Sequence, residues 1–177
     1  MGIQKKLISV LSCLCILLSN SYYSYAVEST QFEEENYSYE YYNKDTGEYF
    51  IWEGTNPNSR SNVVGTFRFK IQRFLRPDKN FFFKTDKVKV VMNEAYFANY
   101  EGVKKSCCNK HRFNISVQRY GVTNNYAYFT APIISTTSKK LGGGFLLSPT
   151  PYRIEITNES ELPSYVFLCG SGNISNY

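Results

Sequence analysis

The strongest constraint on the fold is a period of two in hydrophobicity, which recurs in short runs after residue 49. Apolar and polar residues alternate in residues 63–72, 87–92, 112–118 and 152–157. This pattern over about four to eight residues is typical of a strand with one buried face. Two denser apolar runs, 126–131 and 165–169, favour strands buried on both faces. The chain therefore reads as a series of short strands.

Turn-forming residues separate these runs and include two glycine-rich stretches, 142–144 and 170–172. Residues 151–158 and 165–172 read as a final hairpin. The best helical candidate, 93–103, covers only one or two turns. Aromatic residues make up 17% of the chain and suit a pleated sheet. We predict an all-β fold, an antiparallel two-sheet β-sandwich of about seven to nine strands, over residues 49–177.

The first 26 residues have the features of a secretory signal peptide. Lys5 and Lys6 precede an apolar run from Leu7 to Leu18, and small residues lead up to Ala26. The run is shorter than the roughly 20 apolar residues of a spanning helix. We expect cleavage after Ala26, a secreted extracellular protein and no transmembrane segment in the mature chain.

Residues 27–48 form an acidic, tyrosine-rich leader. Residues 27–50 hold seven acids and one base, a net charge of −6, whereas residues 51–177 hold seventeen bases and eight acids, a net charge of +9. The leader has few aliphatic residues to bury, so we expect it to be extended and flexible. The alternative is an electrostatic cover that lies on the basic domain.

Three cysteines remain after the expected cleavage: Cys107, Cys108 and Cys169. An exported chain can keep a disulfide. We predict that Cys169 pairs with Cys107 or Cys108 and leaves one thiol free. Two alternatives are a bridge between the vicinal pair and three unpaired thiols.

No enzyme signature is present. His111 is the only histidine, and it is either one ligand of a Cys-Cys-x-x-His site or a solvated loop residue. A structural zinc site needs four ligands, so we expect no metal, and we expect no cofactor. Eight carboxylates after residue 50 offer no recognisable acid–base pair. We predict a non-catalytic protein.

Basic residues on two of the predicted strands give the sharpest binding hypothesis. If the strands share a sheet, the side chains form one electropositive face that attracts an anionic polymer. An ordinary solvated face is the alternative. The candidate residues are Arg68, Lys70, Lys87 and Lys89.

Tyrosines near strand ends suggest a second class of ligand, because sugars stack on aromatic rings. The alternative is that most of them pack in the core. The high content of Tyr, Lys and Asn suits a bacterial source. We therefore expect the four Asn-x-Ser sequons to carry no glycans. The tyrosines are Tyr96, Tyr100, Tyr120, Tyr126 and Tyr128.

The strand rhythm resembles that of small exported bacterial β-sandwiches, including accessory and carbohydrate-binding modules, although no motif names a family. We predict a secreted, non-catalytic β-sandwich that binds an extracellular polymer, either a glycan or an anionic surface polymer, or a protein partner. Because of the expected export, nucleic acid is not an expected partner. The alternatives are a toxin-like effector or inhibitor, and a carboxylate-based hydrolase.

Overall fold

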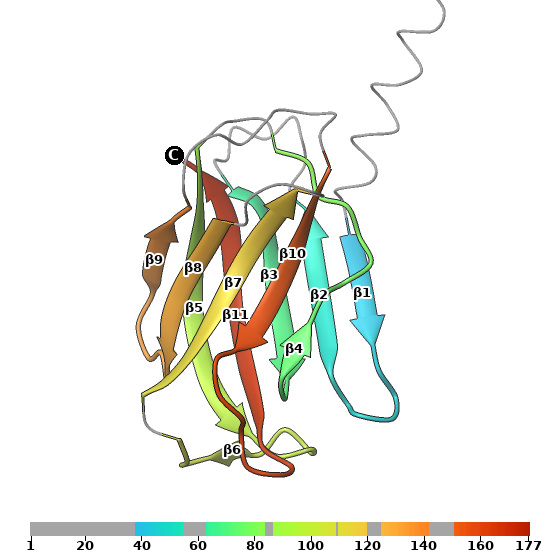
Figure 1. Ribbon diagram of the computed structural model, residues 1–177, viewed down its shortest axis with the longest axis vertical. Coiled ribbons are helices and arrows are strands. Elements are labelled where there is room, and N and C mark those ends of the chain that lie inside the picture. Colours follow the sequence, from blue (N-terminus) through green and yellow to red (C-terminus); the bar gives the residue numbers. More distant parts are fainter. Residues whose placement is uncertain (1–37, 55–62, 84–86, 109, 120–124, 142–150) are drawn as a thin grey trace, which may run out of the picture. The chain divides into compact units, whose positions relative to one another are not determined.

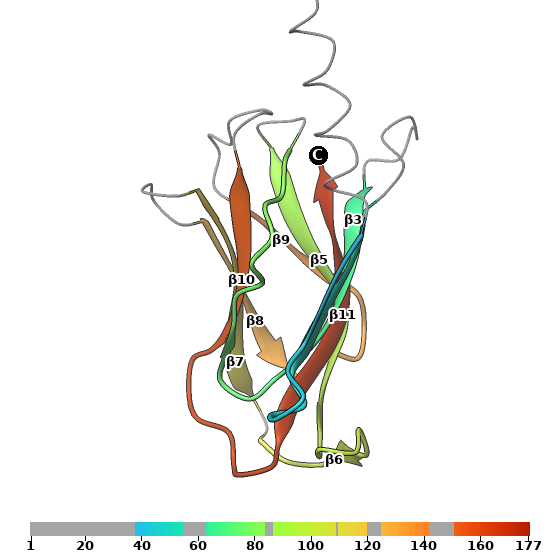
Figure 2. The same ribbon diagram turned by 90° about the vertical axis from the view of Figure 1, so that its right-hand side faces the viewer.

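The predicted antiparallel two-sheet sandwich is confirmed. The computed structural model describes residues 38–54, 63–83, 87–108, 110–119, 125–141 and 151–177. Across these ranges the regular structure consists of eleven strands and no helix. Two antiparallel sheets face each other, and Figure 2 shows the layers edge-on. The count exceeds the prediction partly because two strands have only two residues each.

Sheet A contains seven strands in the order β1-β2-β3-β11-β5-β6, with β9 also paired to β5. Strands β6 and β9 pair with opposite ends of the long strand β5. Figure 1 shows this sheet behind the other. Its strands are β1 (Ser38–Tyr42), β2 (Tyr49–Gly54), β3 (Val63–Ile71), β5 (Val88–Ala98), β6 (Lys104–Lys105), β9 (Thr137–Lys140) and β11 (Phe167–Asn176).

Sheet B contains four strands in the order β4-β10-β7-β8. Strand β7 pairs along its length with both β10 and β8, so it forms the centre of the sheet. The strands are β4 (Phe74–Leu75), β7 (His111–Arg119), β8 (Asn125–Ala131) and β10 (Tyr152–Asn158).

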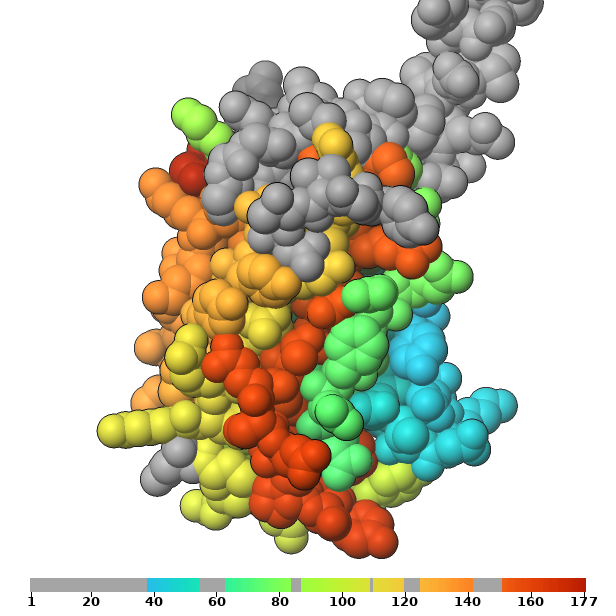
Figure 3. Space-filling model, in the orientation of Figure 1, coloured from blue at the N-terminus to red at the C-terminus, as the bar shows by residue number. Residues whose placement is uncertain are grey.

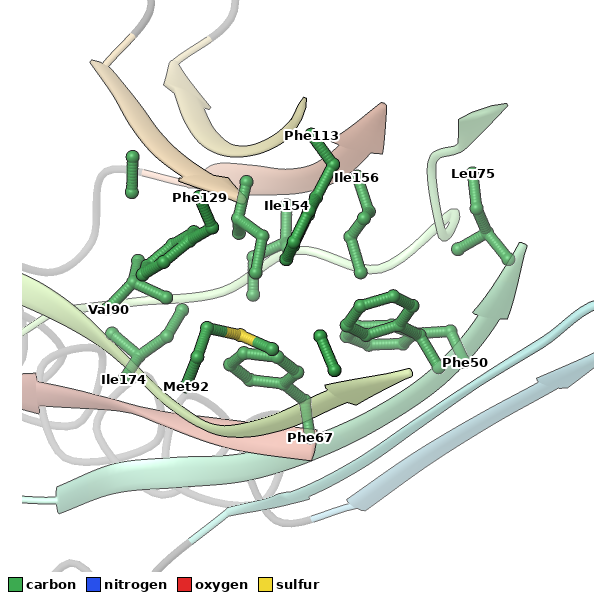
Figure 4. Close-up of a cluster of buried hydrophobic side chains, with 14 of the residues drawn as sticks. Phe50, Phe67, Leu75, Val90, Met92, Phe113, Phe129, Ile154, Ile156 and Ile174 are labelled. Carbon is green, nitrogen blue, oxygen red and sulfur yellow. The ribbon is translucent and has the colours of Figure 1, made fainter. Parts of the chain in front are cut away.

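Alternation along the strands places one face of each sheet in a shared core. Phe50 and Phe67 from sheet A stack in parallel, and Phe113 and Phe129 from sheet B do the same. Figure 4 shows these rings with Met92 between the two layers. Burial of one large apolar side chain stabilises a fold by about 1.5–3 kcal/mol. The alternating apolar residues therefore stabilise the fold by packing between the two sheets.

Strand β11 runs through the middle of sheet A, between β3 and β5. The predicted final hairpin is wrong, because β10 and β11 belong to different sheets. The predicted turn at 170–172 is also wrong, since Gly170 and Gly172 lie inside β11 and face the core rings of β3. A Cβ at Gly170 would lie 2.7 Å from Cζ of Phe69. These glycines leave room for phenyl rings and form no turn.

Part of the predicted flexible leader is structured. Residues 38–42 form β1, the edge strand that pairs with β2. Tyr39 packs against the main core, so an aromatic side chain replaces the aliphatic ones that the leader lacks. Asn43 and Glu48 close the following turn through a backbone hydrogen bond of 2.9 Å. Within the described ranges, the folded domain thus includes the last part of the expected leader.

The helical candidate at 93–103 is also wrong, because β5 continues to Ala98 and a turn follows it. The predicted signal peptide and the leader up to residue 37 lie outside the described residues, as do residue 120 and the stretch 142–144. Across the ranges that the structure describes, no helix is long and apolar enough to span a membrane.

Candidate functional site: the two outer faces

Each sheet turns one side toward the core and the other outward, which gives the domain two outer faces. The A face consists of the outward side chains of sheet A, centred on Tyr49, Arg68, Lys70, Glu94, Tyr96 and Cys169. The B face consists of the outward side chains of sheet B: Phe74, Asn114, Ser116, Tyr126, Tyr128, Glu155 and Thr157.

Lys70 occupies a buried position at one end of the A face. Its side chain is only 6% exposed, so the expectation that it faces solvent is wrong. The Nζ donates a hydrogen bond of 2.5 Å to the carbonyl of Tyr100. The same atom lies 4.5 Å from the ring centroid of Phe167, a cation–π contact. Aromatic rings that project over the strand therefore cover this lysine.

Burial also affects the neutral acids in the same row of the A face. Burial is the largest cause that raises the pKa of Tyr49 and of Tyr96. Burial raises the pKa of the Cys169 thiol to about 11, although nearby Lys70 opposes the shift. All three groups keep their protons at neutral pH, so none of them is an anionic partner for Lys70. The Nζ of Lys70 instead contacts a carbonyl and the faces of aromatic rings.

Arg68, Lys70 and Lys89 share the outer side of sheet A, but the four basic candidates do not form one cluster. Lys70 lies opposite Cys169, and Lys89 lies opposite Ser175, six positions farther along β11. At about 3.4 Å per residue this separates them by about 20 Å along the strand. Arg68 forms an ion pair of 3.5 Å with Glu53. Lys87 precedes β5 at the same end as Lys89.

A basic cluster at that end includes a residue that the sequence reasoning missed. Lys89 lies directly opposite Lys140 of β9. Like charges at opposed positions destabilise a sheet. The Nζ of Lys140 lies 4.4 Å from the ring centroid of Tyr177, which partly offsets that repulsion. The register of β9, which sequence alone does not give, creates this pair.

The predicted disulfide to Cys169 is wrong in this structure, where Cys107, Cys108 and Cys169 are all free. Cys169 packs on the A face in a small cluster with Ala98 and Phe167. The vicinal cysteines pack instead against the main core. Cys169 and Phe167 share one side of β11, and that side is the outer one.

His111 is buried at the start of β7, so the solvated-loop interpretation is wrong. Its ring meets the ring of Phe97 edge-on at 5.8 Å between centroids. Its Nδ1 lies 3.3 Å from Oγ of Ser160. Within the described ranges, no group of three or more His, Cys, Asp or Glu side chains is placed to hold a metal ion. His111 thus fills space at the end of the core.

The B face carries a stacked column of exposed aromatic and cationic side chains. Tyr126 and Tyr128 are 42% and 44% exposed, so the prediction that their strand is buried on both faces is wrong. Their rings stack at 5.8 Å with an angle of 26°. The guanidinium of Arg112 lies 5.4 Å from the Tyr128 centroid. Figure 3 looks onto this face, with β8 in orange. The column holds both rings in place.

Arginines around the B face are paired with carboxylates. Arg112 lies 3.1 Å from Glu159, and Arg153 lies 3.4 Å from Asp78. The Nε of Arg76 donates to Glu155 over 2.8 Å. Exposed pairs of this kind contribute little stability. They do cancel charge, so this part of the surface is close to neutral.

Short polar side chains lie between the aromatic residues of the B face. Asn114 sits in one cross-strand row between Thr157 and Tyr128, and Ser116 sits in the next row beside Tyr126. Asn114 is 8% exposed, and its Oδ1 has no hydrogen-bond partner among the described atoms. An unsatisfied buried acceptor costs about 1–3 kcal/mol. This oxygen is buried under the B face and stays unpaired there.

Comparisons with known proteins add only a likeness in fold. No family model and no curated protein matches the chain. It is similar to TmCBM61 in complex with β-1,4-galactotriose, with a TM-score of 0.40 and 8% identity over 81% of this chain and 92% of that one. It is also similar to Drosophila melanogaster CENP-C bound to CAL1, with a TM-score of 0.31 and 9% identity over 77% and 80%. The Drosophila melanogaster CENP-C cupin domain matches at 0.30 and 8% over 77% and 74%. No ligand transfers to this chain at such values.

Proposed function

We propose that this chain is a non-catalytic, extracellular binding domain that holds an uncharged glycan on its B face. The observation that carries the proposal is the exposed Tyr126–Tyr128 stack on a surface whose arginines are neutralised by carboxylates. Tyrosine combines an apolar ring with a hydroxyl, which suits a sugar that presents both C–H and O–H groups.

The order already present in the column supports this function. The tyrosine rings are stacked on each other and against Arg112 before any ligand arrives. Binding therefore loses less side-chain entropy than it would with mobile rings. The half-buried side chains of Glu155 and Thr157 lie on the same face, as the few polar groups of a ligand site do.

The test is a screen of uncharged oligosaccharides, followed by titration calorimetry with the best one. Replacing both Tyr126 and Tyr128 with alanine is expected to weaken binding at least about tenfold, because the contact surface is lost. Tyr42→Ala is the matched control, since Tyr42 is an exposed tyrosine on the edge strand of sheet A. Equal loss in both variants, or no binding by the natural chain, would contradict the proposal.

An anionic polymer on the A face is the second candidate, favoured by the opposed Lys89 and Lys140. A polyanion would relieve their repulsion and would bind less tightly as salt rises. Uncharged glycans should bind almost independently of salt. Titrations at low and high salt with one ligand of each kind therefore separate the two candidates, and Lys89→Glu should affect only the anionic one.

A further inference from the structure

The vicinal cysteines between β6 and β7 are a feature that glycan binding does not use. Adjacent residues in an extended strand point to opposite sides. Here Cys108 has φ of 61°, a conformation that is uncommon for residues other than glycine. Both side chains then share one side of the chain, and the two Sγ atoms lie 2.6 Å apart. A covalent S–S bond is about 2.05 Å long, so little movement separates the thiols from a bond.

Both vicinal thiols are accessible to solvent, and the third cysteine lies in another part of the domain. Cys107 and Cys108 are both partly exposed, whereas Cys169 is buried on the A face in a different cluster. The Cys108 thiol donates a hydrogen bond to Cys107 Sγ. An uncommon backbone conformation in a partly exposed pair points to a functional role for the pair.

We propose that Cys107 and Cys108 form a reversible dithiol–disulfide couple, closed by a small-molecule disulfide such as oxidised glutathione. One cysteine thiolate attacks the oxidant, forms a mixed disulfide and releases one glutathione thiolate. The neighbouring thiolate then attacks the protein sulfur of that mixed disulfide and releases the second glutathione. Two cysteine thiols lose two protons and two electrons, and one glutathione disulfide becomes two glutathione thiols.

The closed ring should be easy to reduce. Consecutive Cα atoms are about 3.8 Å apart, closer than the separation of about 4.4–6.8 Å usual in disulfides. Strained bridges have the higher reduction potentials of labile, regulatory disulfides. Burial raises the pKa of the Cys107 thiol to about 11. An attack by Cys107 on the oxidant is then slow at neutral pH, whereas ring closure is fast because the neighbouring thiol is already in place.

The test uses the folded full-length chain, treated with oxidised glutathione, quenched with acid, denatured and alkylated. Trypsin releases residues 106–110, which hold both vicinal cysteines, apart from residues 154–177, which hold Cys169. The expected result is a 106–110 peptide that is lighter by two hydrogen atoms and carries no alkyl group. Dithiothreitol before alkylation should restore two alkylated cysteines. Two alkyl groups without that reductant, or a cross-link to the Cys169 peptide, would overturn the proposal.

Two controls separate the folded geometry from simple sequence proximity. Cys108→Ser should accumulate the glutathione adduct on Cys107, because the attacking neighbour is gone, while Cys169→Ser should close the ring normally. In the natural chain, the ratio of ring to adduct should be about tenfold higher when folded than in urea. An equal ratio in both states would show that the backbone at Cys108 contributes nothing and would also overturn the proposal.

Discussion

The two outer faces of the sandwich are built from similar side chains but handle charge differently. On the A face, Lys70 is buried beneath aromatic rings, and other lysines gather at the far end near Lys140. On the B face, Arg112 and Arg153 are paired with carboxylates, and the tyrosines stand exposed beside them. The same residue types thus serve internal packing on one face and an available surface on the other.

The difference follows from what lies above each sheet. The turn after β5 brings Tyr100 over the A face, where its carbonyl accepts a hydrogen bond from Lys70. The edge strand β8 instead presents Tyr126 and Tyr128 to solvent. Alternation within a strand tells which residues point outward, but only a neighbouring segment decides whether they reach water.

The largest expected effect is on the buried lysine. Lys70→Glu should lower the free energy of unfolding by about 3 kcal/mol, because a carboxylate would face the Tyr100 carbonyl and the electron-rich ring faces. Urea unfolding followed by circular dichroism measures the change. Lys89→Glu is the matched control and should cost less than about 0.5 kcal/mol, since it replaces a like-charge pair. Equal costs would remove the distinction between the two ends of the A face.

Alkaline pH should weaken the domain through the A face. The Cys169 thiol ionises near pH 9 when unfolded but only near pH 11 when folded, so the folded state holds the proton longer. Stability from this group is complete below pH 9 and is lost as pH rises toward 11, by about 2 kcal/mol. Tyr49 and Tyr96 act in the same direction above pH 10.

Urea unfolding at pH 8 and pH 10.5, with reductant present, checks this prediction. Cys169→Ala should lose less stability between the two pH values than the natural chain does, whatever its stability at pH 8. The same pH dependence in both proteins would mean that the thiol is not buried as described.

The smallest expected change in stability is on the B face. Asn114→Leu should leave the free energy of unfolding unchanged or raise it by up to about 1 kcal/mol, because it removes an unsatisfied buried oxygen. The same variant should bind the glycan with unchanged affinity, as measured by calorimetry, because this oxygen is buried under the surface. A large loss of stability would show that Asn114 supports the sheet, and weaker glycan binding would show that the ligand reaches its side chain.

Alternation predicted β3, β7 and β10 well, because each strand needs only its own pattern of burial. It failed at β11, where Gly170 and Gly172 suggested a turn although they adjoin phenyl rings of β3. Sheet membership and register depend on distant segments, so sequence placed β10 and β11 in one hairpin. For the same reason, the sequence did not show that Lys70 and Lys89 lie far apart, or that Lys89 lies opposite Lys140.

The candidate site was only partly predictable for a similar reason. Tyr126 and Tyr128 were among five named tyrosines, and their spacing around Ala127 gave the available signal for a shared face. Tyr96 was named with them, yet it lies on the A face, where burial is the largest cause that raises its pKa. The pairing of Arg112 joins β7 to Glu159, which follows the end of β10. Neither this charge cancellation nor the contact of Arg112 with Tyr128 is therefore visible in the sequence.

The glycines of β11 set a limit on how this chain can vary. A side chain at Gly172 would collide with the backbone carbonyl of Val91, which cannot move aside as a flexible side chain can. At Gly170 the obstacle is the rigid ring of Phe69. If position 172 is replaced by each other amino acid in turn, we expect no variant to fold. This holds even though glycine itself contributes no side-chain contact. The positions that tolerate substitution least are then glycines, whose role is to leave room for neighbouring atoms.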